Sequence, residues 1–132
     1  MVRFKGKLYL LPAPIEENGL ASIPAEAIRI MHSLDHFIVE RARTSRRYIS
    51  STKPPKKIEG LIIEEMPEDV ANTKLMEAQM QPLLDGKDMG ILSEAGMRAL
   101  ADPGSKYGAI AHGLGLRAVP LAGRPRTRMA LI

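Results

Sequence analysis

Five short apolar runs alternate with segments of helical periodicity along the chain, and this alternation limits the possible folds more than any other feature. Runs of this length are typical of strands that are buried on both faces of a parallel sheet, with helices in the connections. The 132 residues suffice for one domain with a sizeable core. The pattern therefore predicts an α/β domain of three layers (α/β/α) around a five-stranded, mainly parallel sheet. The predicted strands are 7–11, 37–39, 61–63, 89–92 and 116–121.

Apolar spacing and capping residues predict the helices between these strands. The first helix is expected to begin after Ser22 as N-cap, with Pro24 near its first turn. The first strand is expected to end at Pro12-Ala13-Pro14, because proline cannot donate a ladder hydrogen bond. Pro54 and Pro55 predict an exposed loop after the second helix. The remaining predicted helices are 43–50, 69–84, 105–114 and the opening of another at 127–132.

The stretch 89–104, MGILSEAGMRALADPG, predicts a ligand site. A short strand runs into a glycine-containing loop and then into a helix, so a strand's carboxyl end, free backbone N–H groups and a helix N-terminus converge there. The spacing matches neither GxGxxG nor the P-loop. Glu94 could accept hydrogen bonds from a ligand, or Ser93 and Glu94 could merely cap the loop. Asp102 could likewise only start the following helix.

Positive charge is concentrated in residues 41–57, which hold seven lysines and arginines and no acid. The rest of the chain has 12 basic and 15 acidic residues, although the whole carries +4. A local basic segment favours an anionic partner such as RNA, and Arg43, Arg46 and Arg47 would share one helical turn from which they could clamp phosphates. The alternative is a solvated helix face and loop.

Several classes of site and location are disfavoured. The chain has no cysteine, which excludes disulfides, thiolate zinc and a cysteine nucleophile. No GxSxG elbow is present, and His32, His36 and His112 lack a metal-binding spacing, so we expect them to be surface or structural residues and expect no metal. No apolar run reaches the length of a membrane span, and no signal peptide is evident, so we expect a cytoplasmic protein with no membrane partner.

Three stretches resemble the N-terminal domain of the tetrapyrrole methylase superfamily, which uses S-adenosylmethionine. They are 8–15 (LYLLPAPI), 37–47 (FIVERARTSRR) and 90–123, which holds GILSEAG, ADPGS and VPLAG. Their order and spacing are most similar to the branch that methylates ribose 2′-hydroxyls of ribosomal RNA. The resemblance implies a sheet order of 3-2-4-1-5, with S-adenosylmethionine in a cleft between this domain and a second, C-terminal domain.

The resemblance also implies site residues. The residues expected near the cofactor are Pro12, Ser93, Glu94, Ala95, Gly96, Asp102, Pro103, Gly104 and Gly123. The residues expected to contact RNA phosphates are Arg41, Arg43, Arg46 and Arg47. Glu40 and Glu94 are the nearest candidates for the base that a ribose hydroxyl requires, and no catalytic residue is assigned.

The chain departs from the family at Met97-Arg98, at the turn 123–126, and by ending at Ile132, where the family continues into another domain. The expectation is a single N-terminal-type domain, 1–132, without the C-terminal domain, that is weakly active or inactive alone or forms a homodimer. Two alternatives stay open: a precorrin methylase domain, and a non-catalytic α/β module that binds RNA or dimerises.

Overall fold

The computed structural model describes residues 5–13, 23–68, 72–94 and 103–121, which form a single five-stranded parallel sheet with helices on both faces. The strand order is β3-β2-β4-β1-β5, and every neighbouring pair is parallel. The predicted fold class and the order 3-2-4-1-5 are therefore confirmed. The strands are β1 (Lys7–Ala13), β2 (His36–Val39), β3 (Ile62–Glu65), β4 (Met89–Glu94) and β5 (Arg117–Pro120).

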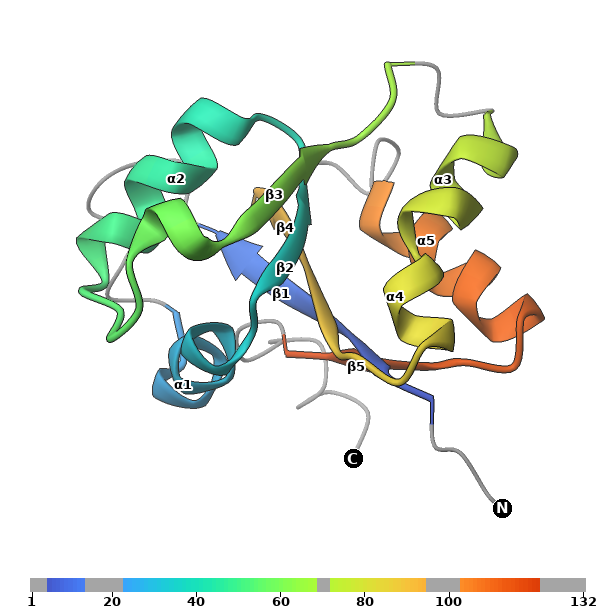
Figure 1. Ribbon diagram of the computed structural model, residues 1–132, viewed down its shortest axis with the longest axis horizontal. Helices are drawn as coiled ribbons and strands as arrows, with labels where there is room; N and C mark the ends of the chain where they lie inside the picture. Colours follow the sequence, from blue (N-terminus) through green and yellow to red (C-terminus); the bar gives the residue numbers. More distant parts are fainter. Residues whose placement is uncertain (1–4, 14–22, 69–71, 95–102, 122–132) are drawn as a thin grey trace, which may run out of the picture.

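The helices form two outer layers. The α-helices are α1 (Ala25–Ser33), α2 (Ala42–Ser51), α3 (Thr73–Gln79), α4 (Gln81–Leu84) and α5 (Pro103–Gly113), and a short 3-10 helix, η2 (Ile58–Gly60), precedes β3. Figure 1 shows α1 and α2 on one side of the sheet and α3, α4 and α5 on the other. This is the predicted three-layer arrangement.

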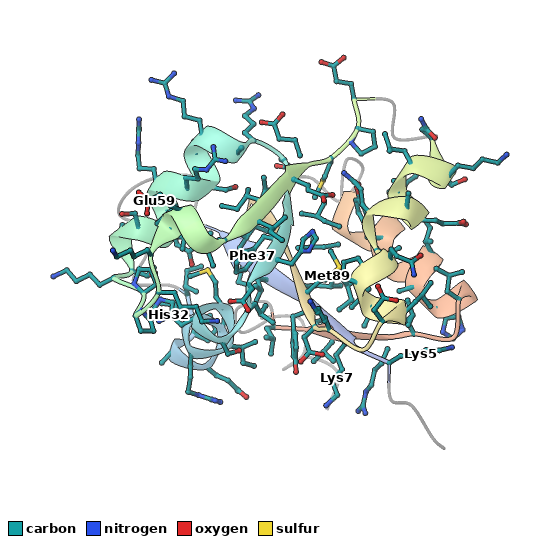
Figure 2. The ribbon with its side chains drawn as sticks, in the orientation of Figure 1. Lys5, Lys7, His32, Phe37, Glu59 and Met89 are labelled. Atoms are coloured by element: carbon teal, nitrogen blue, oxygen red, sulfur yellow. The ribbon has the colours of Figure 1, made fainter. Side chains whose placement is uncertain are left out.

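Alternating side chains of the buried strands fill a separate apolar core on each face. Phe37 and Leu92 pack with α1 and α2, whereas Ile38, Met89 and Ile91 pack with α3, α4 and α5. The labelled Phe37 and Met89 lie in the interior of the molecule (Figure 2). Since the strands are apolar on both faces, they read as continuous hydrophobic runs, which is why their positions could be predicted from the sequence.

Strand β1 ends at Ala13, within the segment Pro12-Ala13-Pro14 at which the first strand was expected to end, and Pro12 is in register with Ser93. The backbone carbonyl of Leu10 accepts a hydrogen bond from Leu121 N–H at 2.9 Å, so the backbone groups of Leu10 face β5. Every second residue of a strand faces the same way, so the backbone nitrogen of Pro12 also points toward β5. However, β5 ends at Pro120, opposite Leu10. The missing N–H of Pro12 therefore faces a side with no strand left to pair.

The prediction of one helix over 69–84 is wrong. Residues 69–71 lie outside the described residues, and the remainder forms α3 and α4, which meet at Met80. Asn72 caps α3 by accepting a hydrogen bond from Leu75 N–H at 3.1 Å. The break follows from Pro82, which has no N–H to donate and would clash with the carbonyl four residues earlier.

Other boundaries shift by a few residues. Strand β4 includes Ser93 and Glu94, which were expected to lie beyond it, and α5 begins at Pro103 rather than 105. The expected N-cap Ser22, the loop after β4 and the expected helix at 127–132 lie outside the described residues.

Candidate functional site

The two segments expected to border a ligand are direct neighbours. Strands β1 and β4 are paired along their length, with Leu11 opposite Leu92 and Pro12 opposite Ser93. Because the strands are parallel, both carboxyl ends open at the same edge of the sheet. Leu11 and Leu92 are buried directly beneath this edge. The structure therefore provides an apolar floor where the two strands end.

The chain leaves this pair of strands in opposite directions. After β1 it reaches α1, which packs with α2 on one face, and after β4 it reaches α5 on the other face. The strand order also reverses here, since β2 and β3 lie beyond β4 whereas β5 lies beyond β1. A reversal of this kind is the usual ligand crevice of an open α/β sheet, since the two connections diverge and leave the strand ends uncovered.

The structure brings together part of the predicted cofactor-binding set. Pro12 is buried in β1, Ser93 and Glu94 end β4, and α5 begins with Pro103 followed by the buried Gly104. Since α5 leads from the carboxyl end of β4 back to the start of β5, its N-terminus lies at the candidate edge. Ala95, Gly96, Asp102 and Gly123 lie outside the described residues.

Helix α5 is held against the sheet by Tyr107, whose side chain is fully buried. The Tyr107 hydroxyl donates to Gln79 Oε1 at 2.5 Å, and Gln79 Nε2 donates to the backbone carbonyl of Glu65 at 2.8 Å. Burial, with the Glu64 carboxylate as a second cause, raises the pKa of Tyr107 to about 12. The phenol therefore stays a neutral hydrogen-bond donor well above pH 10, where an exposed tyrosine would ionise.

We expect the raised pKa of Tyr107 to appear as alkaline instability. An unfolded tyrosine ionises near pH 10, so the contribution is intact below pH 10 and is lost between about pH 10 and 12. Two pH units correspond to about 3 kcal/mol of unfolding free energy. Tyr107→Phe should cost about 1 kcal/mol at neutral pH through the lost hydrogen bond. Urea unfolding at a series of pH values should show a shallower alkaline decline for Tyr107→Phe; parallel profiles would contradict this.

The predicted RNA-contacting arginines lie at the same edge of the sheet. Val39, at the end of β2, is opposite Leu92, so Glu40 and Arg41 follow β2 beside the end of β4. Arg41 is the N-cap of α2. Arg43, Arg46 and Arg47 also have exposed side chains, and none of the four forms an ion pair within the described part of the chain. In Figure 2, nitrogen-tipped side chains project from α2 into open space.

A residue that the sequence analysis missed caps this helix. The Glu65 carboxylate, at the end of β3, accepts a hydrogen bond from Ala42 N–H at 2.8 Å. Arg41 makes no side-chain cap, and the first turn of α2 holds no acid. A negative charge here stabilises the positive end of the helix dipole. The 23-residue separation leaves no local capping pattern to detect.

The histidines have structural surroundings. His32 Nε2 lies 2.8 Å from Thr52 Oγ1, and burial lowers the pKa of His32. His36 Nε2, in β2, is 3.3 Å from a Glu64 carboxylate oxygen in the neighbouring β3. The contact has the distance of an ion pair but not the alignment of a hydrogen bond. His112 is exposed in the last turn of α5.

A hollow of about 520 Å³ lies at the opposite, amino-terminal edge of the sheet. Its lining includes Asp35, Asp85 and Asp88. Asp35 pairs with Lys56, Asp85 accepts from Gln81 Nε2 at 3.3 Å, and Asp88 accepts from Lys7 N–H at 2.8 Å. Because these carboxylates already have partners, the carboxyl edge is the better candidate site.

The described residues hold neither a metal cluster nor a membrane-spanning helix. No three histidine, aspartate or glutamate side chains there converge so as to hold a metal ion. Among the same residues, no helix combines the length and apolar character needed to cross a bilayer.

Curated relatives match most of the chain. "Ribosomal RNA small subunit methyltransferase I" of Halalkalibacterium halodurans is 27% identical over 97% of this chain and 42% of its own length. The protein of the same name from Helicobacter pylori is 30% identical, over 79% of this chain and 38% of its own. These matches support the resemblance to the tetrapyrrole methylase superfamily. No family model matches the sequence.

A solved structure with a similar architecture supports the fold. The uroporphyrin-III-C-methyltransferase of Thermus thermophilus superimposes with a TM-score of 0.62 at 14% identity, over 89% of this chain and 47% of that one. At this identity the likeness concerns the fold. The chain spans about 40% of the length of the curated relatives it matches. The superfamily resemblance inferred from three sequence stretches is confirmed.

Proposed function

We propose that this chain is the N-terminal domain of an S-adenosylmethionine-dependent methyltransferase whose substrate is a ribose 2′-hydroxyl of ribosomal RNA. The observation that carries the proposal is the shared edge: β1 and β4 end side by side at the reversal of strand order, and the arginine-bearing N-terminus of α2 follows β2 at the same edge. Donor and acceptor would thus approach one edge from neighbouring strands. The relatives, named as ribosomal RNA methyltransferases, support this substrate class.

The chemistry requires little covalent participation from the protein. Bound S-adenosylmethionine supplies an electrophilic methyl group, which a nucleophile takes in an in-line displacement. The chain's residues would orient the two reactants and exclude water. Leu11 and Leu92 would form the apolar floor, and the first turn of α5 would border the donor. Glu40, which directly follows β2, or Glu94, which ends β4, would accept the hydroxyl proton.

The remaining inferences belong to the same proposal. The residues around the donor would be Pro12, Ser93–Gly96, Asp102–Gly104 and Gly123, and a second domain or a second copy of the chain would complete the cleft. Ribosomal RNA as substrate favours a cytoplasmic location. A precorrin acceptor is the alternative; the exposed arginines of α2 favour RNA, because a macrocycle does not need an extended basic surface.

Calorimetry with S-adenosylhomocysteine tests the cofactor assignment. We expect saturable heat of binding to the wild-type chain, and no heat at millimolar ligand would reject it. Binding of ribosomal RNA fragments should weaken steeply as salt rises, because phosphate contacts release counterions. Cofactor binding without salt-dependent RNA binding would favour the precorrin alternative.

A further inference from the structure

A chain of three hydrogen bonds joins α2 to α5 around the carboxyl end of β3. Ala42 N–H donates to the Glu65 side chain, the Glu65 carbonyl accepts from Gln79 Nε2, and Gln79 Oε1 accepts from the Tyr107 hydroxyl. Tyr107 lies three residues after Gly104, within one helical turn. The connected ends are the N-termini of the helices that we assign to RNA and to the cofactor.

We call these three hydrogen bonds the α2–α5 bridge. The side-chain amide of Gln79 suits the centre of this bridge because it offers both a donor and an acceptor. A backbone carbonyl can only accept, so the amide nitrogen of Gln79 must face Glu65 and its oxygen is left for the Tyr107 hydroxyl. The raised pKa keeps that hydroxyl protonated. An aliphatic residue satisfies neither partner, and a glutamate would lack the donor.

The bridge links two helices that pack in different apolar cores, on opposite faces of the sheet. In the described residues, α2 contributes Ile49 to the core on one face, whereas α5 contributes Tyr107 and Ala111 to the core on the other. Moreover, Glu65 is exposed and places a negative charge beside a surface of arginines, which opposes phosphate binding. Its position is better explained by holding the helix than by contact with RNA.

We propose that Glu65 and Gln79 are positioning residues that hold the RNA-binding helix α2 in a fixed relation to α5 at the cofactor crevice. The inference rests on the proposed function. The positioning role predicts different effects on binding and on turnover. When the bridge is broken, each ligand still binds, but the ribose hydroxyl and the methyl group are no longer aligned. Misplacement by about 1 Å can lower a rate by about a hundredfold.

The test compares methyl transfer to ribosomal RNA by the wild-type chain and by Glu65→Ala, Glu65→Gln and Gln79→Leu. Glu65→Gln loses the charge but keeps an acceptor for Ala42 N–H. Glu59→Ala is the matched control, because Glu59 is an exposed carboxylate on η2, which packs against α2 (Figure 2). Calorimetry gives the affinities for S-adenosylhomocysteine and RNA, and thermal melts show that each variant is folded.

We expect Glu65→Ala and Gln79→Leu to lower kcat at least about tenfold, with the affinity for S-adenosylhomocysteine within about twofold of wild type and RNA bound no more weakly than by wild type. Glu65→Gln should restore kcat, and Glu59→Ala should match wild type. Unchanged kcat would overturn the positioning role while the proposed function stands. So would a wild-type chain that binds both ligands but transfers no methyl group, because the fixed relation of α2 to α5 would then not suffice to align the reactants. Equal loss in Glu65→Gln and Glu65→Ala, or tighter RNA binding by Glu65→Ala with normal kcat, would also overturn it. A wild-type chain that binds neither ligand would reject the proposed function and this role with it.

Discussion

Replacing Arg43, Arg46 and Arg47 together with alanine should weaken binding of ribosomal RNA about thirtyfold at moderate salt. The three guanidinium groups are exposed on α2 and have no ion-pair partner within the described residues, so they are available to phosphates. Each lost phosphate contact lowers the steepness of the plot of log K against log salt by about 0.7 to 0.9. The slope should therefore fall in magnitude by about 2 to 3. Fluorescence anisotropy over a range of salt concentrations measures both quantities.

The control removes equal charge elsewhere. Arg29, Lys74 and Arg117 are exposed on α1, α3 and β5, and changing them to alanine also lowers the net charge from +4 to +1. We expect this variant to bind RNA within about threefold of wild type, because these residues lie on elements other than α2 and would not contact the phosphates that α2 binds. Equal losses in the two variants would mean that overall charge, and not the surface of α2, binds RNA.

Gly90→Val should destabilise the folded chain by about 3 kcal/mol, because the centre of the sheet has no room for a side chain there. Gly90 lies in β4 between Tyr9 and Phe37 of the neighbouring strands. A Cβ atom would come within 2.9 Å of side-chain atoms of Leu11 and Leu34 and within 3.1 Å of Phe37. Valine adds two methyl groups beyond that, so the buried side chains of Leu11, Leu34 and Phe37 would have to leave their present rotamers. Urea unfolding measures the loss.

Gly113→Ala is the matched glycine control. A Cβ at this last residue of α5 meets no atom within 4 Å. Alanine has the higher helix propensity, so stability should be unchanged or rise by about 0.5–1 kcal/mol. If Gly90→Val unfolded at the same urea concentration as wild type, the close packing of β4 against Leu11 and Leu34 would be wrong.

The layers of the fold could be predicted from the sequence because they depend on local periodicity. Strands buried on both faces have continuous apolar sequences. Strands β2 and β4 therefore lie where the apolar runs 37–39 and 89–92 predicted them. The strand order is different, since nothing local says that β4 lies between β1 and β2. The order came from the resemblance of the three stretches to a known family.

What the sequence analysis did not predict depends on distant elements. Pro12 can lie within β1 because the pairing with β5 extends only to Leu10 in the described residues, and this cannot be predicted from the residues around Pro12. The Glu65 cap of α2 depends on the register that brings β3 beside β2. For the site, the pairing of β1 with β4 agrees with the expectation, whereas the contacts of individual residues with cofactor and RNA stay predictions.

Backbone amide NMR during titration with S-adenosylhomocysteine tests the central claim most directly. If the ligand binds between the carboxyl ends of β1 and β4, the largest shifts should fall on Leu11, Leu92 and Gly104. The amides of Asp35 and Asp88, which line the hollow at the opposite edge, should stay unchanged. Shifts centred on Asp35 and Asp88, with Leu11 and Leu92 unmoved, would contradict the proposed cofactor site.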